Sequence, residues 1–264
     1  MRGIVNAAGR FAVAIFPDRD IADARHVAFS RSFRRQEATI KPYRPGFQGR
    51  LDPHVPGISN FDEDSRVLCA TDRRRVSSLG NRQWHTDYTF METTGLYSMP
   101  HATIISPEGD ETRFAGLCTA YDALSGRMNQ AWEGGTAEHS LFYSHDTICF
   151  ANFSDEEKSR LDSVPQLLEC MHPGSKRKTL YRASHAMPIH GMEIPEGRIL
   201  PKEPMDCARR LEFVDTHAWN AGDMVPRDNR CAMHRACQYD AFQAREPHRT
   251  AVSEATPPMQ RSTA

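Results

Sequence analysis

Residues 84–90 read WHTDYTF and place a histidine and an aspartate two positions apart among residues that favour strands. In a strand, residues i and i+2 project from the same face, so His85 and Asp87 can reach one point in space. A neutral imidazole nitrogen and a carboxylate oxygen are suitable ligands for a divalent transition metal. The same spacing is also typical of an ordinary polar pair on a half-exposed strand. A metal site therefore requires a third ligand elsewhere in the chain.

The C-terminal third of the sequence offers that ligand and two arginines. The segment DNRCAMHR, residues 228–235, places His234 after a short predicted strand and a turn. Two histidines and one carboxylate on one face of an octahedron leave positions open for other ligands, as in non-haem Fe(II) oxygenases. Arg245 and Arg249 follow, and a guanidinium group is the natural bidentate partner of a carboxylate. One could anchor a dicarboxylic acid that chelates the metal and the other an anionic substrate, although each alone is also typical of a surface residue.

The composition predicts an ordinary globular protein. The 264 residues carry a formal net charge of −1 and are 39% hydrophobic and 25% charged, which suits a single domain over residues 1–264. The short basic runs at 34–35 and 73–75 are interpreted as solvated, so no nucleic-acid partner is expected. No apolar run approaches the ~20 residues of a membrane helix, so no membrane partner is expected. Seven cysteines without a CxxC pair favour a reducing, cytoplasmic setting.

The order of predicted elements favours a mainly β protein with inserted helices. Strand patterns fall at residues 11–16, 66–70, 84–90, 102–106, 178–183, 213–218, 223–225 and 249–252. Helical spacing covers residues 20–35 and 119–129, and a further helix is expected from about residue 203. The sequence SDEE at 154–157 has the spacing of a capping box and should begin another helix. Many short strands with few helices fit a β-sandwich or jelly roll better than a parallel sheet.

Five blocks of the sequence resemble the taurine/2,4-dichlorophenoxyacetate dioxygenase family, TauD/TfdA, and occur in family order. They are GNRQWHTDYTF (80–90), SPEGDETRFAGLCTAYDAL (106–124), HPGSKRKTLYRASHA (172–186), WNAGDMVPRDNRCAMHRACQYD (219–240) and REPHRT (245–250). With a weaker match at AFSRSF (28–33), they cover most of the chain. GNRQWH, the SHA at 184–186 and DNRCAMHR are more similar to the phenoxyacetate branch.

The resemblance implies a fold and a reaction. The family fold is a double-stranded β-helix, the jelly roll that the strand pattern also favours. The implied enzyme is a non-haem oxygenase that uses Fe(II), 2-oxoglutarate and O2. It would hydroxylate, or otherwise oxidise, a C–H bond of a small organic anion and release succinate and CO2. Relatives are commonly dimers or tetramers, which makes a homo-oligomer an open expectation.

The resemblance also implies roles for individual residues. The expected Fe(II) ligands, and thus the catalytic centre, are His85, Asp87 and His234. The expected contacts to 2-oxoglutarate are Thr112 and Arg245. The expected contacts to the substrate are Arg249, Asn81, Lys41 and His185, of which Lys41 is equally consistent with a solvated loop residue.

The chain departs from the family pattern in three places. Arg227 stands where relatives carry a tryptophan beside the cosubstrate, and it could add a salt bridge, reshape the pocket or weaken 2-oxoglutarate binding. The sequence begins late, so that part of one sheet is expected to be absent or differently built. Pro201 and Pro204 fall where relatives run a continuous helix.

Two alternative functions stay open at this stage. Arg227 and the short N-terminus are compatible with a non-catalytic ligand-binding or sensing relative on the same scaffold. The same two histidines and aspartate could also serve a zinc hydrolase. The zinc reading leaves Thr112 and Arg245 without a role.

Overall fold

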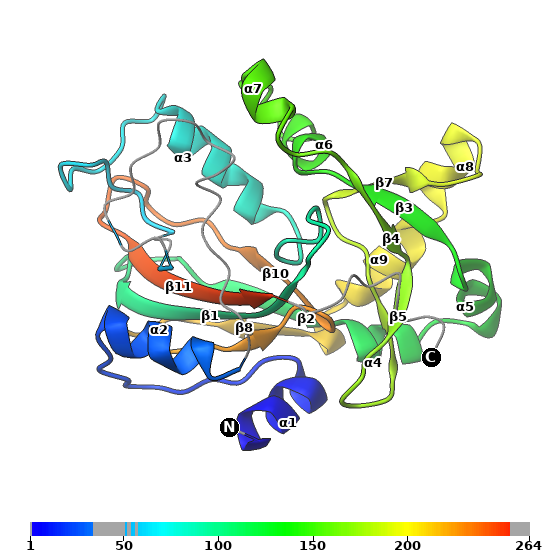
Figure 1. The fold of residues 1–264 in the computed structure, drawn as a ribbon, viewed down its shortest axis with the longest axis horizontal. Helices are drawn as coiled ribbons and strands as arrows, with labels where there is room; N and C mark the ends of the chain where they lie inside the picture. The colour runs from blue at the N-terminus through cyan, green and yellow to red at the C-terminus, as the bar shows by residue number, and fades with distance from the viewer. Residues whose placement is uncertain (1, 34–50, 52–53, 56–57, 254–264) are drawn as a thin grey trace.

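Two three-stranded antiparallel sheets form the part of the molecule that carries the candidate site (Figure 1). The computed structural model describes residues 2–33, 51, 54–55 and 58–253, and the statements that follow concern these residues. In the first sheet, β1 (Gly95–Ile104) lies between β11 (Glu246–Ser253) and β9 (Arg227–Asp228). In the second, β2 (Thr112–Gly116) lies between β10 (Ala232–Ala236) and β8 (Val214–His217). The sheets are antiparallel, as expected for a β-sandwich or jelly roll and not for a parallel sheet, but the described residues contain more helices than the sequence predicts.

The central strand β1 is buried along most of its length because helices cover it. Eight consecutive residues of β1 are buried, in place of the alternation expected for a half-exposed strand. Helix α2 (Asp23–Arg31) packs against the first sheet, as Figure 1 shows. Phe29 and the following Phe33 extend this contact toward Leu96 and Met99 of β1. The helix predicted within residues 20–35 is thereby confirmed, and its aromatic side chains fix the outer face of the sheet.

The segment between β2 and β8 forms a second body of structure beside the two sheets (Figure 1). Its sheet has the order β4 (Val164–Leu167), β3 (Thr136–His139), β7 (Ala186–Ile189), and a hairpin joins β5 (Glu169–Met171) to β6 (Lys178–Leu180). Its helices are α4 (Leu117–Asp122), α5 (Gly126–Trp132), α6 (Leu141–Asp146), α7 (Asp155–Lys158), α8 (Ile194–Ile199) and α9 (Lys202–Ala208), followed by the short η3 (Leu211–Phe213). The largest hydrophobic cluster lies here, around the fully buried Trp132.

Helix ends in this segment follow local capping chemistry. The capping box is confirmed, because Ser154 accepts from Glu157 N–H and the Glu157 side chain accepts from Ser154 N–H. The single helix predicted over 119–129 is wrong, since Ser125 caps a new helix by accepting from Met128 N–H. The helix expected from about residue 203 is confirmed as α9. Pro204 lies in its first turn, where its missing N–H costs little.

Several predicted strands are only isolated bridges. The strand predicted at 11–16 is wrong at its start, because α1 (Arg2–Phe11) ends there and Ala12 has a φ of 68°. Single antiparallel bridges then pair Val13 with Arg227 and Phe16 with Met224. The segments 66–70, 84–90 and 223–225 likewise contribute single bridges in place of strands. Their β-favouring residues are extended over too few positions to build a ladder.

Two helical turns, α3 (Arg73–Ser78) and η2 (Leu79–Arg82), precede the WHTDYTF segment and lie over the sheets in Figure 1. Asp72 caps α3 by accepting from Arg74 N–H. All seven cysteines are free thiols. Among the described residues, no helix is both long and apolar enough to cross a membrane.

We expect replacement of His139 by leucine to make the protein more resistant to acid. His139 is fully buried in β3, and neither ring nitrogen has a hydrogen-bond partner among the described residues. Burial, assisted by Arg182, lowers the pKa of His139 to about 3. In the unfolded chain, His139 binds a proton near pH 6.5. The free energy of unfolding of the native protein therefore decreases as the pH falls from 6.5 toward 3. The loss is on the order of 3 kcal/mol at pH 4.

The measurement is urea unfolding of both proteins between pH 7.5 and pH 4. The leucine variant should have equal or higher stability at pH 7.5 and a flatter decline toward acid. Parallel declines in the two proteins would show that His139 does not titrate in this way.

Candidate active site

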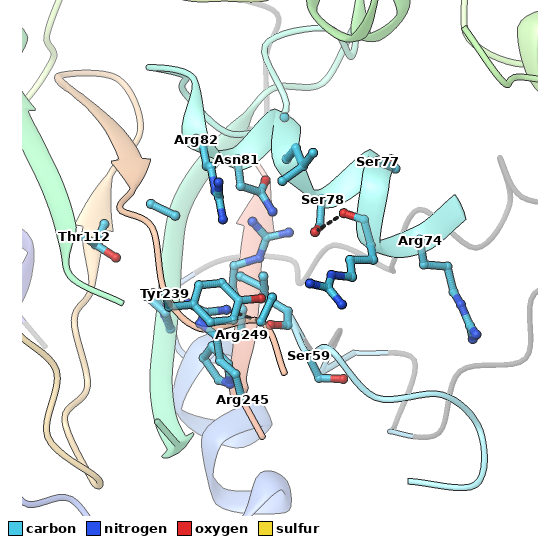
Figure 2. A pocket seen from close by; sticks show the side chains of 18 of the residues that line it. Ser59, Arg74, Ser77, Ser78, Asn81, Arg82, Thr112, Tyr239, Arg245 and Arg249 are labelled. Atoms are coloured by element: carbon cyan, nitrogen blue, oxygen red, sulfur yellow. Dashed lines mark hydrogen bonds between the residues drawn. The ribbon is translucent and has the colours of Figure 1, made fainter. Parts of the chain in front are cut away.

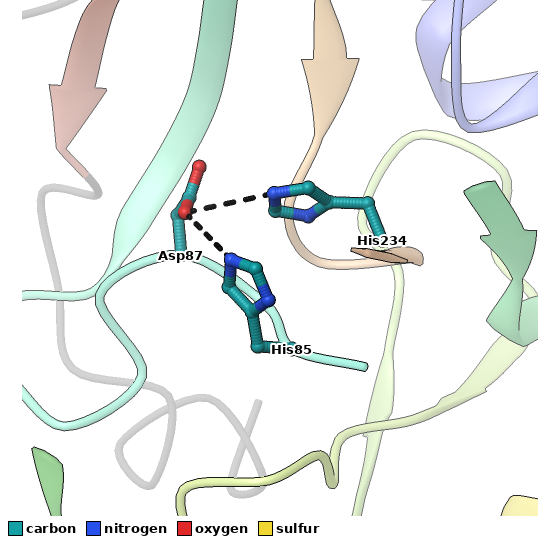
Figure 3. Close-up of side chains that lie close together, drawn as sticks. All are labelled: His85, Asp87 and His234. Carbon is teal, nitrogen blue, oxygen red and sulfur yellow. Dashed lines mark ion pairs between the residues drawn. The ribbon is translucent and has the colours of Figure 1, made fainter. Parts of the chain in front are cut away.

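Backbone pairing brings the three predicted metal ligands together. The His85 N–H donates to the carbonyl of His234 at 2.9 Å, and the His234 N–H donates back to the carbonyl of His85 at 2.8 Å. This single antiparallel bridge sets the two imidazole centroids 4.1 Å apart. Ligand atoms of His85, Asp87 and His234 all lie within 4.8 Å of one another, and all three residues are buried (Figure 3).

The local geometry differs from the predicted strand. The His85–Asp87 pair was expected to share a face through strand alternation, but only His85 is bridged and residues 87–90 form a turn. Tyr88, with a φ of 60°, turns the chain directly after Asp87. The side chains still converge, because the carboxylate is directed by its hydrogen bonds and not by a ladder.

Both histidines are in the form that binds a metal. His85 Nδ1 donates to the carbonyl of Gln83 at 2.8 Å, which leaves the Nε2 lone pair toward Asp87 Oδ1 at 3.8 Å. His234 Nε2 lies 3.9 Å from the same oxygen, and its Nδ1 has no partner among the described residues. Burial lowers the pKa of each histidine, so both imidazoles stay neutral. Two nitrogens and one oxygen that face a common point fit a transition-metal ion.

The two oxygens of Asp87 have different surroundings. Oδ1 faces the histidines and accepts from Arg249 Nη1 at 3.1 Å. Oδ2 accepts from Ser98 Oγ at 2.6 Å and from Arg227 Nη2. Burial acts to raise the pKa of Asp87, but the Arg249 and Arg227 guanidinium groups hold it well below its usual range. Asp87 is therefore a carboxylate with one oxygen directed to the candidate metal position.

A cavity of about 620 Å³ opens above the triad. The lining includes His85, Asp87 and His234 together with Arg227, Arg245 and Arg249. Figure 2 shows Arg245 and Arg249 near Tyr239, with Asn81 on the neighbouring helical turn. The apolar lining includes Val55, Ile58, Leu68, Val76, Leu79 and Phe90. Such a chamber can take a ligand with an apolar body and anionic groups.

The predicted cosubstrate contacts also line this cavity. Thr112 Oγ1 accepts from Trp219 Nε1 at 3.0 Å, so the hydroxyl hydrogen remains available to a ligand. Arg245 is 8% exposed and its Nε donates to Asp110 Oδ1, while its Nη1 donates to the carbonyl of Ile58 at 2.9 Å. Burial raises the pKa of Asp110 against the opposing effect of Arg245. Arg245 is thus a buried cation held in place by its neighbours.

Three of the four predicted substrate contacts lie at the cavity, and the fourth lies outside the described residues. Arg249 reaches Asp87 and also donates to the Tyr88 hydroxyl at 3.2 Å. Asn81 and His185 line the cavity, and His185 Nδ1 lies 2.9 Å from Ser144 Oγ. Lys41 lies outside the described residues.

Several residues in and next to the cavity carry no clear signal in the sequence. Ser98 lies inside an apolar strand, and Asp110 lies in a segment that reads as a turn. Tyr88 lies within the quoted stretch, but its contact with Arg249 depends on the turn. Arg74 and Arg75 were interpreted as solvated, yet α3 brings both to the rim of the cavity. The Tyr88 contact with Arg249 joins residues 161 positions apart, so local sequence patterns do not reveal it.

The fold and the site together define a class of protein. Two histidines and one carboxylate with an open side, placed beneath a cavity with buried arginines, form the ligand set of non-haem oxygenases that take anionic ligands. The family model described as "Taurine catabolism dioxygenase TauD, TfdA family" matches residues 2–251, and the chain belongs to this family. It is a 2-oxoglutarate-dependent dioxygenase.

Curated relatives and solved structures agree with this assignment. The chain is 33% identical to the 2,4-dichlorophenoxyacetate dioxygenase of Cupriavidus pinatubonensis over 90% of this chain and 83% of that protein. It is 30% identical to the (S)-phenoxypropionate dioxygenase of Sphingobium herbicidovorans over 89% of this chain and 79% of that protein. The structure of AAD-2 with Mn(II) and N-oxalylglycine is 35% identical, with a TM-score of 0.93 over 97% of this chain and 89% of that chain. The non-catalytic alternative finds no support among these proteins.

Proposed function

We propose that this enzyme hydroxylates a C–H bond of a small organic anion with Fe(II), 2-oxoglutarate and O2, and releases succinate and CO2. One observation carries the proposal. His85 Nε2, His234 Nε2 and Asp87 Oδ1 converge at the base of a cavity that also contains buried arginines. When bound there, iron would supply O2 activation coupled to decarboxylation of the cosubstrate.

The side chains that line the cavity would bind either the iron or the cosubstrate, according to their charge and position. His85, Asp87 and His234 would hold the iron, and their shared side toward the cavity would leave positions for other ligands. Arg245 would pair with the distal carboxylate of 2-oxoglutarate, and the free Thr112 hydroxyl hydrogen would donate to the same group. These contacts would orient the cosubstrate with its 2-oxo acid end toward the iron.

The substrate would be held by charge at one end and by apolar contacts at the other. Arg249 would bind its anionic group close to the metal centre, and Asn81 and His185 would contact its body. The apolar lining would exclude water from the carbon that reacts. Relatives named for phenoxyacetate and phenoxypropionate substrates support an aromatic or alkyl carboxylate as the first class to test.

We also propose that the two site-bearing sheets form a double-stranded β-helix within a single domain. The strand order β11–β1–β9 and β10–β2–β8 places the His234 strand and the Arg249 strand in different sheets. A jelly roll would direct residues of both sheets into one interior. The fold similarity to AAD-2 supports this architecture.

An anaerobic titration tests the proposed centre. Apo-protein receives Fe(II) and then 2-oxoglutarate, and the expected result is the weak visible charge-transfer band of the metal chelate. Succinate release with O2 is then screened over carboxylates, sulfonates and sulfates. Folded protein without the band would overturn the proposed centre. Activity with Zn²⁺ in the absence of O2 would instead favour the hydrolase alternative.

A further inference from the structure

Arg227 is a buried cation within the candidate metal centre. Its side chain is 3% exposed, lies on β9 and lines the cavity. Its Nη2 donates to Asp87 Oδ2, whereas its Nε has no hydrogen-bond partner among the described residues. A buried guanidinium N–H without a partner is costly, which indicates that a ligand group completes its surroundings.

The position of Arg227 is compatible with a bound ion. Arg227 and Ser98 both hold Oδ2, the oxygen that is not directed to the histidines. Asn229 Nδ2 donates to Ser98 Oγ at 3.0 Å and supports this arrangement. A metal ion would use Oδ1, so Arg227 can keep its contact with Asp87 when the ion is bound.

Neutralising Asp87 does not require Arg227. Arg249 already pairs with this carboxylate, and Ser98 donates a further hydrogen bond. One carboxylate, Asp87, is paired with two guanidinium groups, so these three side chains carry one net positive charge before any ion arrives. A divalent cation then increases a buried positive charge, which is unfavourable until anions compensate it.

We propose that Arg227 is an anion-selecting residue of the metal centre, one that weakens binding of the divalent ion alone and strengthens binding of a carboxylate beside that ion. The inference rests on the proposed function, because it requires the ion at His85, Asp87 and His234. The carboxylate could be the metal-chelating end of the cosubstrate or the anionic group of the substrate. Two probes separate these sources, N-oxalylglycine for the first and phenoxyacetate for the second.

The experiment measures three equilibria on apo-protein prepared without oxygen. Free Mn(II) is followed by electron paramagnetic resonance, and each carboxylate is titrated by calorimetry into Mn(II)-loaded protein. Arg227→Met removes the charge, and Arg227→Lys retains it. Arg230→Met is the matched control, because Arg230 is a partly buried cation that pairs with Asp228 and is not part of the cavity lining.

Arg227→Met should bind Mn(II) several-fold more tightly and at least one of the two carboxylates roughly tenfold more weakly. The carboxylate that weakens is the one that Arg227 contacts. Arg227→Lys and Arg230→Met should stay within a few-fold of the native protein for all three ligands. Opposite changes in the affinity for Mn(II) and in the affinity for a carboxylate indicate a charge effect. A packing defect would lower both affinities.

Native affinities in Arg227→Met, or a loss of both ion and carboxylate binding in folded protein, would overturn the inference. If that variant fails to fold, Arg227→Gln carries the same expectation, since it keeps a donor for Asp87 without the charge. If the native protein binds no Mn(II), the proposed metal centre is overturned as well. If the native protein binds Mn(II) but the variants keep native carboxylate affinities, only the inference on Arg227 is overturned and the proposed metal centre stands.

Discussion

Replacement of His234 by alanine is expected to abolish tight metal binding and to lower succinate formation by at least ~1,000-fold. His234 contributes one of three converging ligand atoms, and its Nε2 faces Asp87 Oδ1 across 3.9 Å. Asp87 already shares its charge with two arginines, so a two-ligand site has little remaining attraction for a divalent ion. The backbone bridge between His85 and His234 does not depend on the imidazole, and the fold should persist.

The measurement is Mn(II) or Fe(II) binding by the apo-protein, together with succinate release under saturating 2-oxoglutarate. His190→Ala is the matched control, because His190 is half exposed and not part of the cavity lining. Circular dichroism verifies that both variants are folded. Native metal affinity in folded His234→Ala protein would contradict the proposed ligand set.

The second large effect is expected at Arg245. Arg245→Met should raise the dissociation constant of 2-oxoglutarate by roughly 100-fold or more, because a buried charge-assisted contact to its distal carboxylate is lost. The metal ligands are not altered, so Mn(II) affinity measured without 2-oxoglutarate should stay within a few-fold of native. The chelate band, titrated anaerobically with 2-oxoglutarate, reports the change directly.

Asp110 complicates this variant and also supplies its control. Removal of Arg245 leaves the buried Asp110 carboxylate without its cationic partner. The double variant Asp110→Ala/Arg245→Met removes both charges. If the unpaired Asp110 carboxylate alone weakens 2-oxoglutarate binding, the affinity should recover in this double variant. Weak 2-oxoglutarate binding that persists in the double variant supports Arg245 as the anchor. Full recovery would show that Arg245 serves chiefly to neutralise Asp110.

Much of the candidate site could be predicted, because residue types and their order along the chain indicate its chemistry. His85, Asp87 and His234 were expected together, and the backbone bridge between 85 and 234 brings them together. The cavity also gathers Thr112, Arg245, Arg249, Asn81 and His185, although no residue role follows from proximity alone. Lys41 remains an expectation outside the described residues.

The fold was predicted at the level of class and missed in several elements. Residues 2–11 carry apolar positions at helical spacing, including the buried Ala8, whereas the β-favouring residues that follow them predict a strand. Residues 84–90 have strand composition, yet the chain turns at Tyr88 because the Asp87 side chain is held by Ser98 and two arginines. Local preference yields where long-range contacts are stronger.

By itself, the sequence determined the candidate ligand types, their order along the chain and the preference for antiparallel over parallel sheets, because these depend on residue chemistry and local periodicity. The tertiary structure decided which oxygen of Asp87 faces the histidines and which is held by Arg227 and Ser98. It also decided that Arg245 is paired with Asp110. Such pairings join residues more than ten and often more than a hundred positions apart. They are settled by burial and charge within the folded interior, where an unpaired ion is costly.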